Sequence, residues 1–256
     1  MTRIATPISH LYKDAAAAIA ITAASDCLEC RDHSPAETHL ELHRLFHFEQ
    51  QIIHPMTDED FDYIRRCCES KPHLELVSFH IASCYDQPVI VEGQFQPGGK
   101  RYERQELLDI AAKNIARLRT FLSPAIIICV ENNNYLRTPA YDHVIEAGFL
   151  RDVVEQNQIH FLYDIAHAHI SAVNMRIPFQ QYYNELPIHR TRQVHICKFG
   201  MRSEDEAYDA HFPPDDFIFS ELKKVLQTAS VDFVTVEYYR ELPGLLQSLQ
   251  SLKEIL

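Results

Sequence analysis

Eight short apolar runs, most of them rich in branched residues, constrain the fold of this chain more than any other feature of its sequence. Runs of this length and composition, separated by polar segments, predict buried β-strands. They are Ile4–Ile8, Cys27–Cys30, Leu42–Phe48, Leu74–Ala82, Ile126–Glu131, His160–Asp164, Gln193–Lys198 and Phe233–Tyr238.

Most of the segments between these runs have the 3.6-residue spacing of amphipathic helices. We predict helices at Asp58–Cys68, Gln105–Phe121, Tyr141–Gln156, Phe217–Ala229 and Leu245–Leu256, the first of them behind an N-cap at Thr57. Strands that alternate with helices favour a parallel sheet. Eight such strands in 256 residues predict an α/β fold of the (β/α)8 TIM-barrel type, with residues 1–256 as one domain. Two polar segments, Gln94–Lys100 and Gly200–Pro214, are expected to be long loops that follow strands.

Composition and charge exclude several classes of protein. Hydrophobic residues make up 46% of the chain, which is too many for a disordered protein. The 24 Lys and Arg residues against 36 Asp and Glu residues give a formal charge of −12, which argues against nucleic acid or an anionic membrane as a partner. The longest apolar stretch, Ala15–Ala24, is too short to span a bilayer. Seven cysteines, with no signal-peptide pattern at the N-terminus, predict reduced thiols in the cytoplasm.

Ionisable side chains follow the later strands at the point where each strand ends. In a TIM barrel these ends meet at one face, where the chemistry of such folds takes place. The residues in question are His80, Glu131, Asp164, His195 and Glu237, with His167 soon after Asp164 and with Asp209 and His211 in the segment after Lys198. We therefore expect these side chains to lie close together.

Each of these residues alone has an ordinary explanation. His80 could be a core histidine, Glu131 could pair with Arg137, and Asp209 and His211 could lie on an exposed acidic face. Together, however, three buried carboxylates would repel one another and raise their own pKa values. A bound cation removes that repulsion, and a mixed set of imidazoles and carboxylates suits iron, manganese or zinc better than magnesium or calcium. The pattern therefore predicts a transition-metal site.

Short motifs in the expected order along the chain carry a resemblance to a known family. They are Ser25–Glu29, His43, Val77–Ala82, Glu131 and Asn132 with Tyr135, Asp164 to His167 with Ser171 and Ala172, Val194 and His195, Asp209 to His211, and Val236 and Glu237. With these motifs the chain resembles the multinuclear nonheme iron-dependent oxidative enzymes, xylose-isomerase-like TIM barrels that modify cysteine-containing peptides in natural-product biosynthesis, methanobactin biosynthesis included.

The resemblance implies a centre of two or three iron ions, cycling between Fe2+ and Fe3+, at which O2 is used to oxidise a peptide substrate. The residues that it implies as metal ligands are His43, His80, Glu131, Asp164, His167, His195, Asp209, His211 and Glu237. Asn132, Asn133 and Tyr135 would orient ligands or substrate, and Lys198 would meet a substrate carboxylate or backbone group. The family also implies a separate peptide-recognition protein.

The chain departs from the family pattern, and a second function stays open. Phe199 stands where the family has a second histidine, which implies fewer metals or a different arrangement of them. Four residues, Glu131, Asp164, His195 and Glu237, also resemble the mononuclear Mn2+ or Zn2+ centre of sugar isomerases and epimerases, in which Glu131 and Glu237 would act as acid and base. A barrel without catalytic activity that binds a partner is a third possibility.

Overall fold

A closed barrel of parallel strands forms the centre of the molecule. The computed structural model describes residues 1–34 and 39–256. In the described part of the chain, the barrel strands follow the order β1-β12-β9-β8-β7-β4-β3-β2, and each pairs in parallel with its neighbours. Their bounds are β1 Arg3–Pro7, β2 Cys27–Arg31, β3 His43–Gln51, β4 Leu76–Ile81, β7 Ile127–Asn132, β8 His160–Asp164, β9 Thr191–Ile196 and β12 Phe233–Val236. The predicted (β/α)8 barrel is confirmed.

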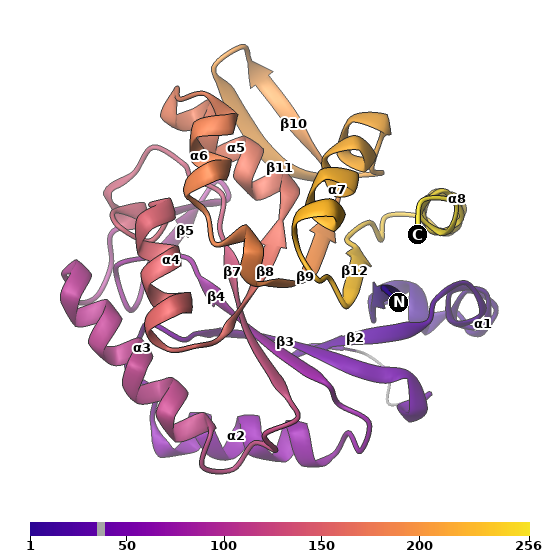
Figure 1. Ribbon diagram of the computed structural model, residues 1–256, viewed down its shortest axis with the longest axis horizontal. Helices are drawn as coiled ribbons and strands as arrows, with labels where there is room; N and C mark the ends of the chain where they lie inside the picture. The colour runs from indigo at the N-terminus through magenta and orange to yellow at the C-terminus, as the bar shows by residue number, and fades with distance from the viewer. Residues whose placement is uncertain (35–38) are drawn as a thin grey trace.

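Helices surround the barrel, with α1 and α8 side by side near the two chain ends (Figure 1). Their bounds are α1 Ala15–Ala24, α2 Asp58–Glu69, α3 Arg104–Leu118, α4 Ala147–Gln156, α5 Ile165–Met175, α6 Phe179–Glu185, α7 Asp216–Thr228 and α8 Leu242–Lys253. Thr57 caps α2 as expected, because its hydroxyl accepts the N–H of Asp60. The sequence analysis did not predict α1, α5 or α6. Apolar residues lie all round α1, and nearly all of α5 is buried, so neither helix shows a one-sided apolar stripe.

The two segments that we expected to be loops each form part of an antiparallel hairpin. Strands β5 (Val89–Val91) and β6 (Gln94–Gln96) form one between β4 and α3, and β10 (Lys198–Ser203) and β11 (Glu206–Phe212) form the other between β9 and α7. The turn of the first hairpin is Glu92-Gly93, and both residues have a positive φ, of 50° and 75°, which matches the twist of a two-residue hairpin. Both hairpins follow the C-terminal end of a barrel strand, where the polar residues gather.

The inside of the barrel changes from apolar to polar along the strands. Successive side chains of a strand point to opposite faces, so residues two apart share the interior. At the N-terminal end of the strands the interior holds one buried apolar cluster, formed by Ala5, Cys27, Leu45, Leu76, Cys129, Leu162 and Phe233. Two residues further along β7, Cys129 is followed by Glu131, and on β12 Phe233 is followed by Thr235. The polar site therefore lies at the C-terminal ends of the strands.

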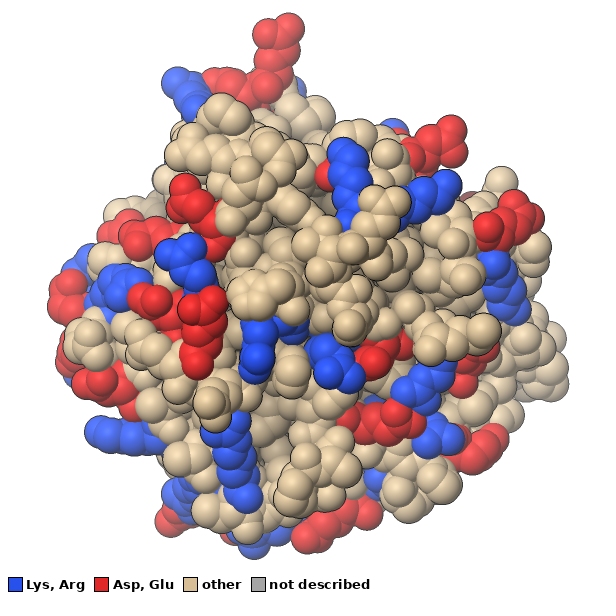
Figure 2. Space-filling view, in the orientation of Figure 1, with Lys and Arg blue, Asp and Glu red and all other residues tan. Residues whose placement is uncertain are grey.

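A larger apolar core lies between the barrel and the helices, with Phe61 of α2 and Phe149 of α4 fully buried in it. On the face shown in Figure 2, basic and acidic side chains are interspersed. Among the described residues, no helix combines the length and the apolar character that crossing a bilayer requires. That residues 1–256 form one domain stays a prediction.

Candidate metal centre

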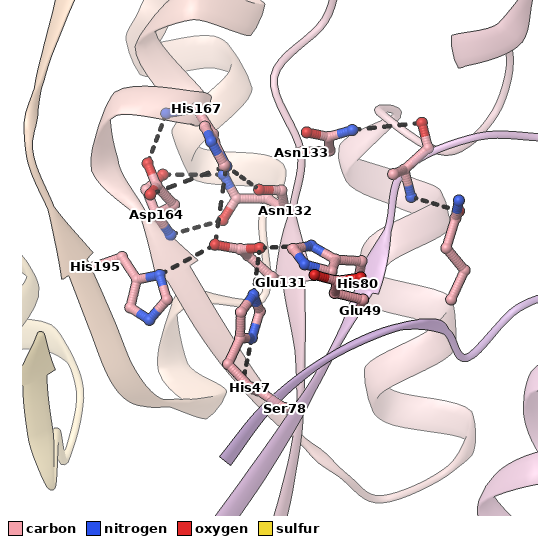
Figure 3. A network of polar contacts seen from close by, with 12 residues as sticks. His47, Glu49, Ser78, His80, Glu131, Asn132, Asn133, Asp164, His167 and His195 are labelled. Atoms are coloured by element: carbon pink, nitrogen blue, oxygen red, sulfur yellow. Dashed lines mark hydrogen bonds and ion pairs between the residues drawn. The ribbon is translucent and has the colours of Figure 1, made fainter. Parts of the chain in front are cut away.

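Glu131, near the end of β7, lies at the centre of a buried polar network (Figure 3). Its Oε2 atom lies 3.0 Å from Nδ1 of His80 and 3.5 Å from Nε2 of His47, and its Oε1 atom lies 3.2 Å from Nδ1 of His195. Burial by itself would raise the pKa of Glu131, but the imidazoles of His47 and His195 hold that pKa well below its usual range. Glu131 is therefore an anionic carboxylate that faces three imidazoles from three other strands.

His195, on β9, has one nitrogen positioned by a carboxylate and one directed into the site. Its Nε2 atom lies 3.0 Å from Oε2 of Glu29. Its Nδ1 atom lies 3.2 Å from Oε1 of Glu131 and 3.4 Å from Oε1 of Glu237, yet has no hydrogen-bond partner among the described residues. Metal-binding histidines are commonly oriented in this way by a carboxylate on the second nitrogen. The Nδ1 atom of His195 is thus available to a cation.

Asp164 links the end of β8 to the start of α5. Its Oδ1 atom accepts the backbone N–H of His167 at 2.7 Å and so caps the helix, which fixes the carboxylate in place. Its Oδ2 atom is buried and has no hydrogen-bond partner within the described part of the chain. Burial, together with the charges of Glu237 and Glu131, raises the pKa of Asp164 to about 7. A buried carboxylate oxygen without a partner is costly unless it binds a proton or a cation.

His167 and the hairpin β10–β11 complete the mouth of the site. Nδ1 of His167 lies 2.9 Å from the carbonyl oxygen of Asn132, and its Nε2 atom lies 3.7 Å from Oδ2 of Asp209. Nε2 of His211 lies 2.6 Å from the same oxygen of Asp209. His167, Asp209 and His211 line an open cavity of about 580 Å³ together with Glu131 and with other residues from several strands.

Three groups of donor atoms in the site are close enough to hold metal ions. They are His47 with His80 and Glu131; Glu131 with Asp164, His195 and Glu237; and Cys197 with His211 and Glu237. Within each group the donor atoms lie within 4.8 Å of one another. Glu131 belongs to the first two groups and Glu237 to the last two, so each could bridge neighbouring metals. Imidazole, carboxylate and thiol donors suit iron or zinc, and the residues therefore fit a multinuclear transition-metal centre.

The structure brings most of the predicted ligands to this site but not His43. The residues it brings together are His80, Glu131, Asp164, His167, His195, Asp209, His211 and Glu237. His43 is the first residue of β3 and lines a separate cavity with Cys30 and Phe46. His47, four residues later, contacts Glu131 in its place. Four residues of a strand span about 13 Å, so one strand cannot deliver both histidines to the same point.

The residues predicted to orient ligands or substrate have different positions. The side-chain amide of Asn132 donates to the carbonyl of Asp164 at 2.9 Å and accepts the N–H of Asp164 at 2.9 Å, so it joins the ends of β7 and β8. Asn133 lines the cavity, whereas Tyr135 packs its ring against Tyr141. Lys198 is exposed and pairs with Asp215 at 2.8 Å, so its ammonium is not directed at the metal-binding residues.

Sequence reasoning missed two charged residues of β2 that belong to the site. Glu29 is fully buried and contacts His195, and the guanidinium of Arg31 forms ion pairs with both Glu29 and Glu237. Burial by itself would raise the pKa of Glu29, but His195 and Arg31 lower that pKa to about 2. Glu29 and Arg31 stand two apart within one strand, and this alternation is the sequence signal that could have placed both side chains on the interior side of the barrel.

The fold is shared with solved structures of low sequence identity. The chain is similar to the structure of an L-ribulose 3-epimerase (13% identity, TM-score 0.59, covering 100% of this chain and 94% of that one). It is similar also to a putative xylose isomerase from Rhodospirillum rubrum (11% identity, TM-score 0.59, covering 99% of each chain). At these identities the likeness shows the fold alone, a xylose-isomerase-like TIM barrel. No curated protein matches the chain.

A family model supplies the identity that these structures leave open. Residues 55–256 match the family described as RiPP precursor modification enzyme MbnB/TglH/ChrH, where a RiPP is a ribosomally synthesised and post-translationally modified peptide. The matched segment includes β4 and every later strand of the barrel, and so all the predicted ligands except His43. The chain belongs to the MbnB/TglH/ChrH family of RiPP precursor modification enzymes.

Proposed function

We propose that the protein is an iron-dependent oxidoreductase that uses O2 to modify a cysteine-containing peptide. Glu131, Asp164, His195 and Glu237 would be its central catalytic residues. The observation that carries this proposal is the sharing of Glu131 and Glu237 among three candidate metal positions, because shared carboxylates are what bridged metal ions require. Membership of a peptide-modifying family supports a peptide as the substrate.

The protein's own residues would hold the reacting groups in place. Iron, when bound, would supply a Lewis acid and the electrons that O2 reduction needs. The carboxylates of Glu131 and Glu237 would balance its charge, and Glu29 would keep Nδ1 of His195 directed inward through its contact with Nε2. Asp164, which burial favours in its protonated form, would give up that proton when a cation binds.

The mouth of the cavity has features that suit a peptide in an extended conformation. Ile90 of β5 and Phe95 of β6 line the cavity, and the Ile90 side chain is 67% exposed. The backbone groups of Phe95 point away from β5. Its N–H donates a hydrogen bond to the Tyr141 hydroxyl, and its C=O accepts one from the Thr138 hydroxyl. Ile90 lies directly opposite Phe95 in the hairpin, so its own backbone groups point away from β6, on the side where no described strand pairs with β5. An added strand could pair there.

A mononuclear isomerase or epimerase is the second candidate function. It is favoured by the position of Nδ1 of His195, which lies within 3.4 Å of a carboxylate oxygen of both Glu131 and Glu237. A single Mn2+ or Zn2+ could bind at this point between two potential acid–base groups. That function would leave the His47–His80 pair and the Cys197–His211 pair without a role, and we rank it second for this reason.

The test is a reaction of the iron-loaded protein with small peptides encoded beside its gene. Each cysteine-containing peptide is incubated with protein and O2, and a matched peptide with serine for cysteine is the control. We expect a mass change in the cysteine peptide, with O2 consumed in proportion, and none in the control. Unchanged peptides without O2 uptake, together with interconversion of ketose sugars by the Mn2+-loaded protein, would instead support the epimerase.

A further inference from the structure

Cys197 directly follows β9, inside the metal-binding mouth of the barrel. It follows His195 by two residues, so the alternation of the strand places both side chains on the interior side. Its side chain is fully buried, and its sulfur lies within 4.8 Å of donor atoms of His211 and Glu237. Cys197 is neither one of the ligands that the sequence predicted nor part of the resemblance to the family.

The histidine of this group has a single nitrogen left for a ligand. Nε2 of His211 is engaged by Oδ2 of Asp209 at 2.6 Å, while its Nδ1 atom is buried and has no hydrogen-bond partner in the described ranges of the chain. His211 also has a φ of 44°, in the left-handed region that few residues other than glycine adopt. A strained backbone of this kind is characteristic of functional sites, where it fixes the direction of a side chain.

The surroundings of Cys197 differ from those of an ordinary buried cysteine. Cys129 is an ordinary one, because it packs in the apolar layer of the barrel with Leu45 and Leu162. Cys197 instead belongs to neither apolar cluster of the described residues, and donor atoms of His211 and Glu237 lie around its sulfur. With a cation bound, the sulfur, the imidazole and the carboxylate would share its charge.

We propose that Cys197, His211 and Glu237 form a metal position of their own, in which Cys197 is a permanent thiolate ligand. This inference rests on the proposed multinuclear centre and adds a protein-derived sulfur to it. On binding, the S–H bond is replaced by a metal–sulfur bond, the proton goes to solvent, and no oxidation state changes. A thiolate donor makes this position the softest of the three, so it selects iron or zinc over magnesium, calcium or manganese.

Cobalt is the probe for this position, because a thiolate bound to Co2+ gives an intense sulfur-to-metal charge-transfer absorption in the near ultraviolet. The metal-free protein is titrated with Co2+ under anaerobic conditions, and bound cobalt is counted after gel filtration. Three proteins are compared: the natural chain, Cys197→Ala and Cys129→Ala. The last is the matched control, a buried cysteine of barrel strand β7, and thermal unfolding confirms that both variants are folded.

We expect the absorption in the natural chain and in Cys129→Ala, and its loss in Cys197→Ala together with a lower cobalt content. Cobalt bound by the natural chain without this absorption, or an absorption that survives in Cys197→Ala, would overturn the thiolate ligand while leaving the histidine and carboxylate centre in place. A natural chain that binds no cobalt would overturn both this inference and the proposed metal-dependent function.

Discussion

Nε2 of His195 and Oε2 of Glu29 lie 3.0 Å apart in the interior of the barrel, where both side chains are fully buried. This contact leaves Nδ1 of His195 directed at Glu131 and Glu237. Glu29 is thus the residue that decides which nitrogen of the histidine is presented to a metal. The carboxylate does so from a different strand, since Glu29 belongs to β2 and His195 to β9.

Replacing Glu29 with glutamine should weaken metal binding without removing a ligand. Losing a carboxylate that orients a metal-binding histidine typically lowers metal affinity by roughly 10- to 100-fold. Titration of metal-free Glu29→Gln with Fe2+ measures the effect. Glu75→Gln is the matched control, because Glu75 also pairs with arginines but precedes β4, at the opposite end of the barrel. Equal affinities for Glu29→Gln and the natural chain would show that Glu29 has no orienting role.

Arg31 should stabilise the metal-free protein. Its guanidinium pairs with Glu29 and Glu237, both of them buried, so Arg31→Met would leave His195 as the main counter-charge of two buried carboxylates. Breaking a buried ion pair from one side costs about 3 kcal/mol or more in the free energy of unfolding. Chemical denaturation with and without Fe2+ measures this. We expect metal to restore more stability to Arg31→Met than to the natural chain, and an unchanged metal-free stability would contradict this role.

Ile90 should contribute to peptide binding at the mouth of the site. We expect Ile90→Ser to raise KM for a peptide substrate about tenfold with little change in kcat, because burying an aliphatic side chain is worth roughly 1.5 kcal/mol. Val89→Ser is the control, since Val89 is also exposed but points to the other face of the hairpin. Steady-state kinetics of both variants test this. Equal KM values for the two variants would mean that the peptide does not contact this face.

His54 should make the stability of the fold depend on pH. Its Nε2 atom donates to the carbonyl of Ser83 at 2.8 Å, and burial lowers its pKa below the ordinary value. A lowered pKa in the folded state means that the stabilisation is complete above the ordinary pKa and is lost as the pH falls. We expect the free energy of unfolding to fall less steeply from about pH 8 to about pH 5 in His54→Gln than in the natural chain. His33→Gln, at an exposed position, should behave like the natural chain.

The barrel could be predicted because eight short, largely apolar segments recur along the chain and alternate with helical ones, as in a (β/α)8 barrel. Helices were predicted where one face differs from the other, as in α2, where Phe61, Ile64 and Cys68 are buried. Helix α1 is apolar all round and α5 is almost wholly buried, so periodicity could not reveal either of them. The first hairpin was missed because β5 and β6 have three residues each, none of them buried.

Only those residues of the candidate site that lie at the ends of apolar strands could be predicted from the sequence. Glu131, Asp164 and Glu237 each lie at or next to the end of an apolar strand, which is a signal readable from sequence. Whether His43 or His47 belongs to the site depends instead on which residue of β3 lies at the mouth of the barrel. The register of β3 against β4 fixes that position, and register comes from long-range packing that the local sequence does not encode.

Metal analysis of protein purified without oxygen tests the central claim most directly. The natural chain is compared with Asp164→Ala, which removes the buried carboxylate oxygen that has no hydrogen-bond partner in the described part of the molecule. We predict more than one equivalent of iron per chain in the natural protein and the loss of most of it in Asp164→Ala. A single zinc or manganese ion without iron, or a metal content that Asp164→Ala leaves unchanged, would contradict the multinuclear iron centre.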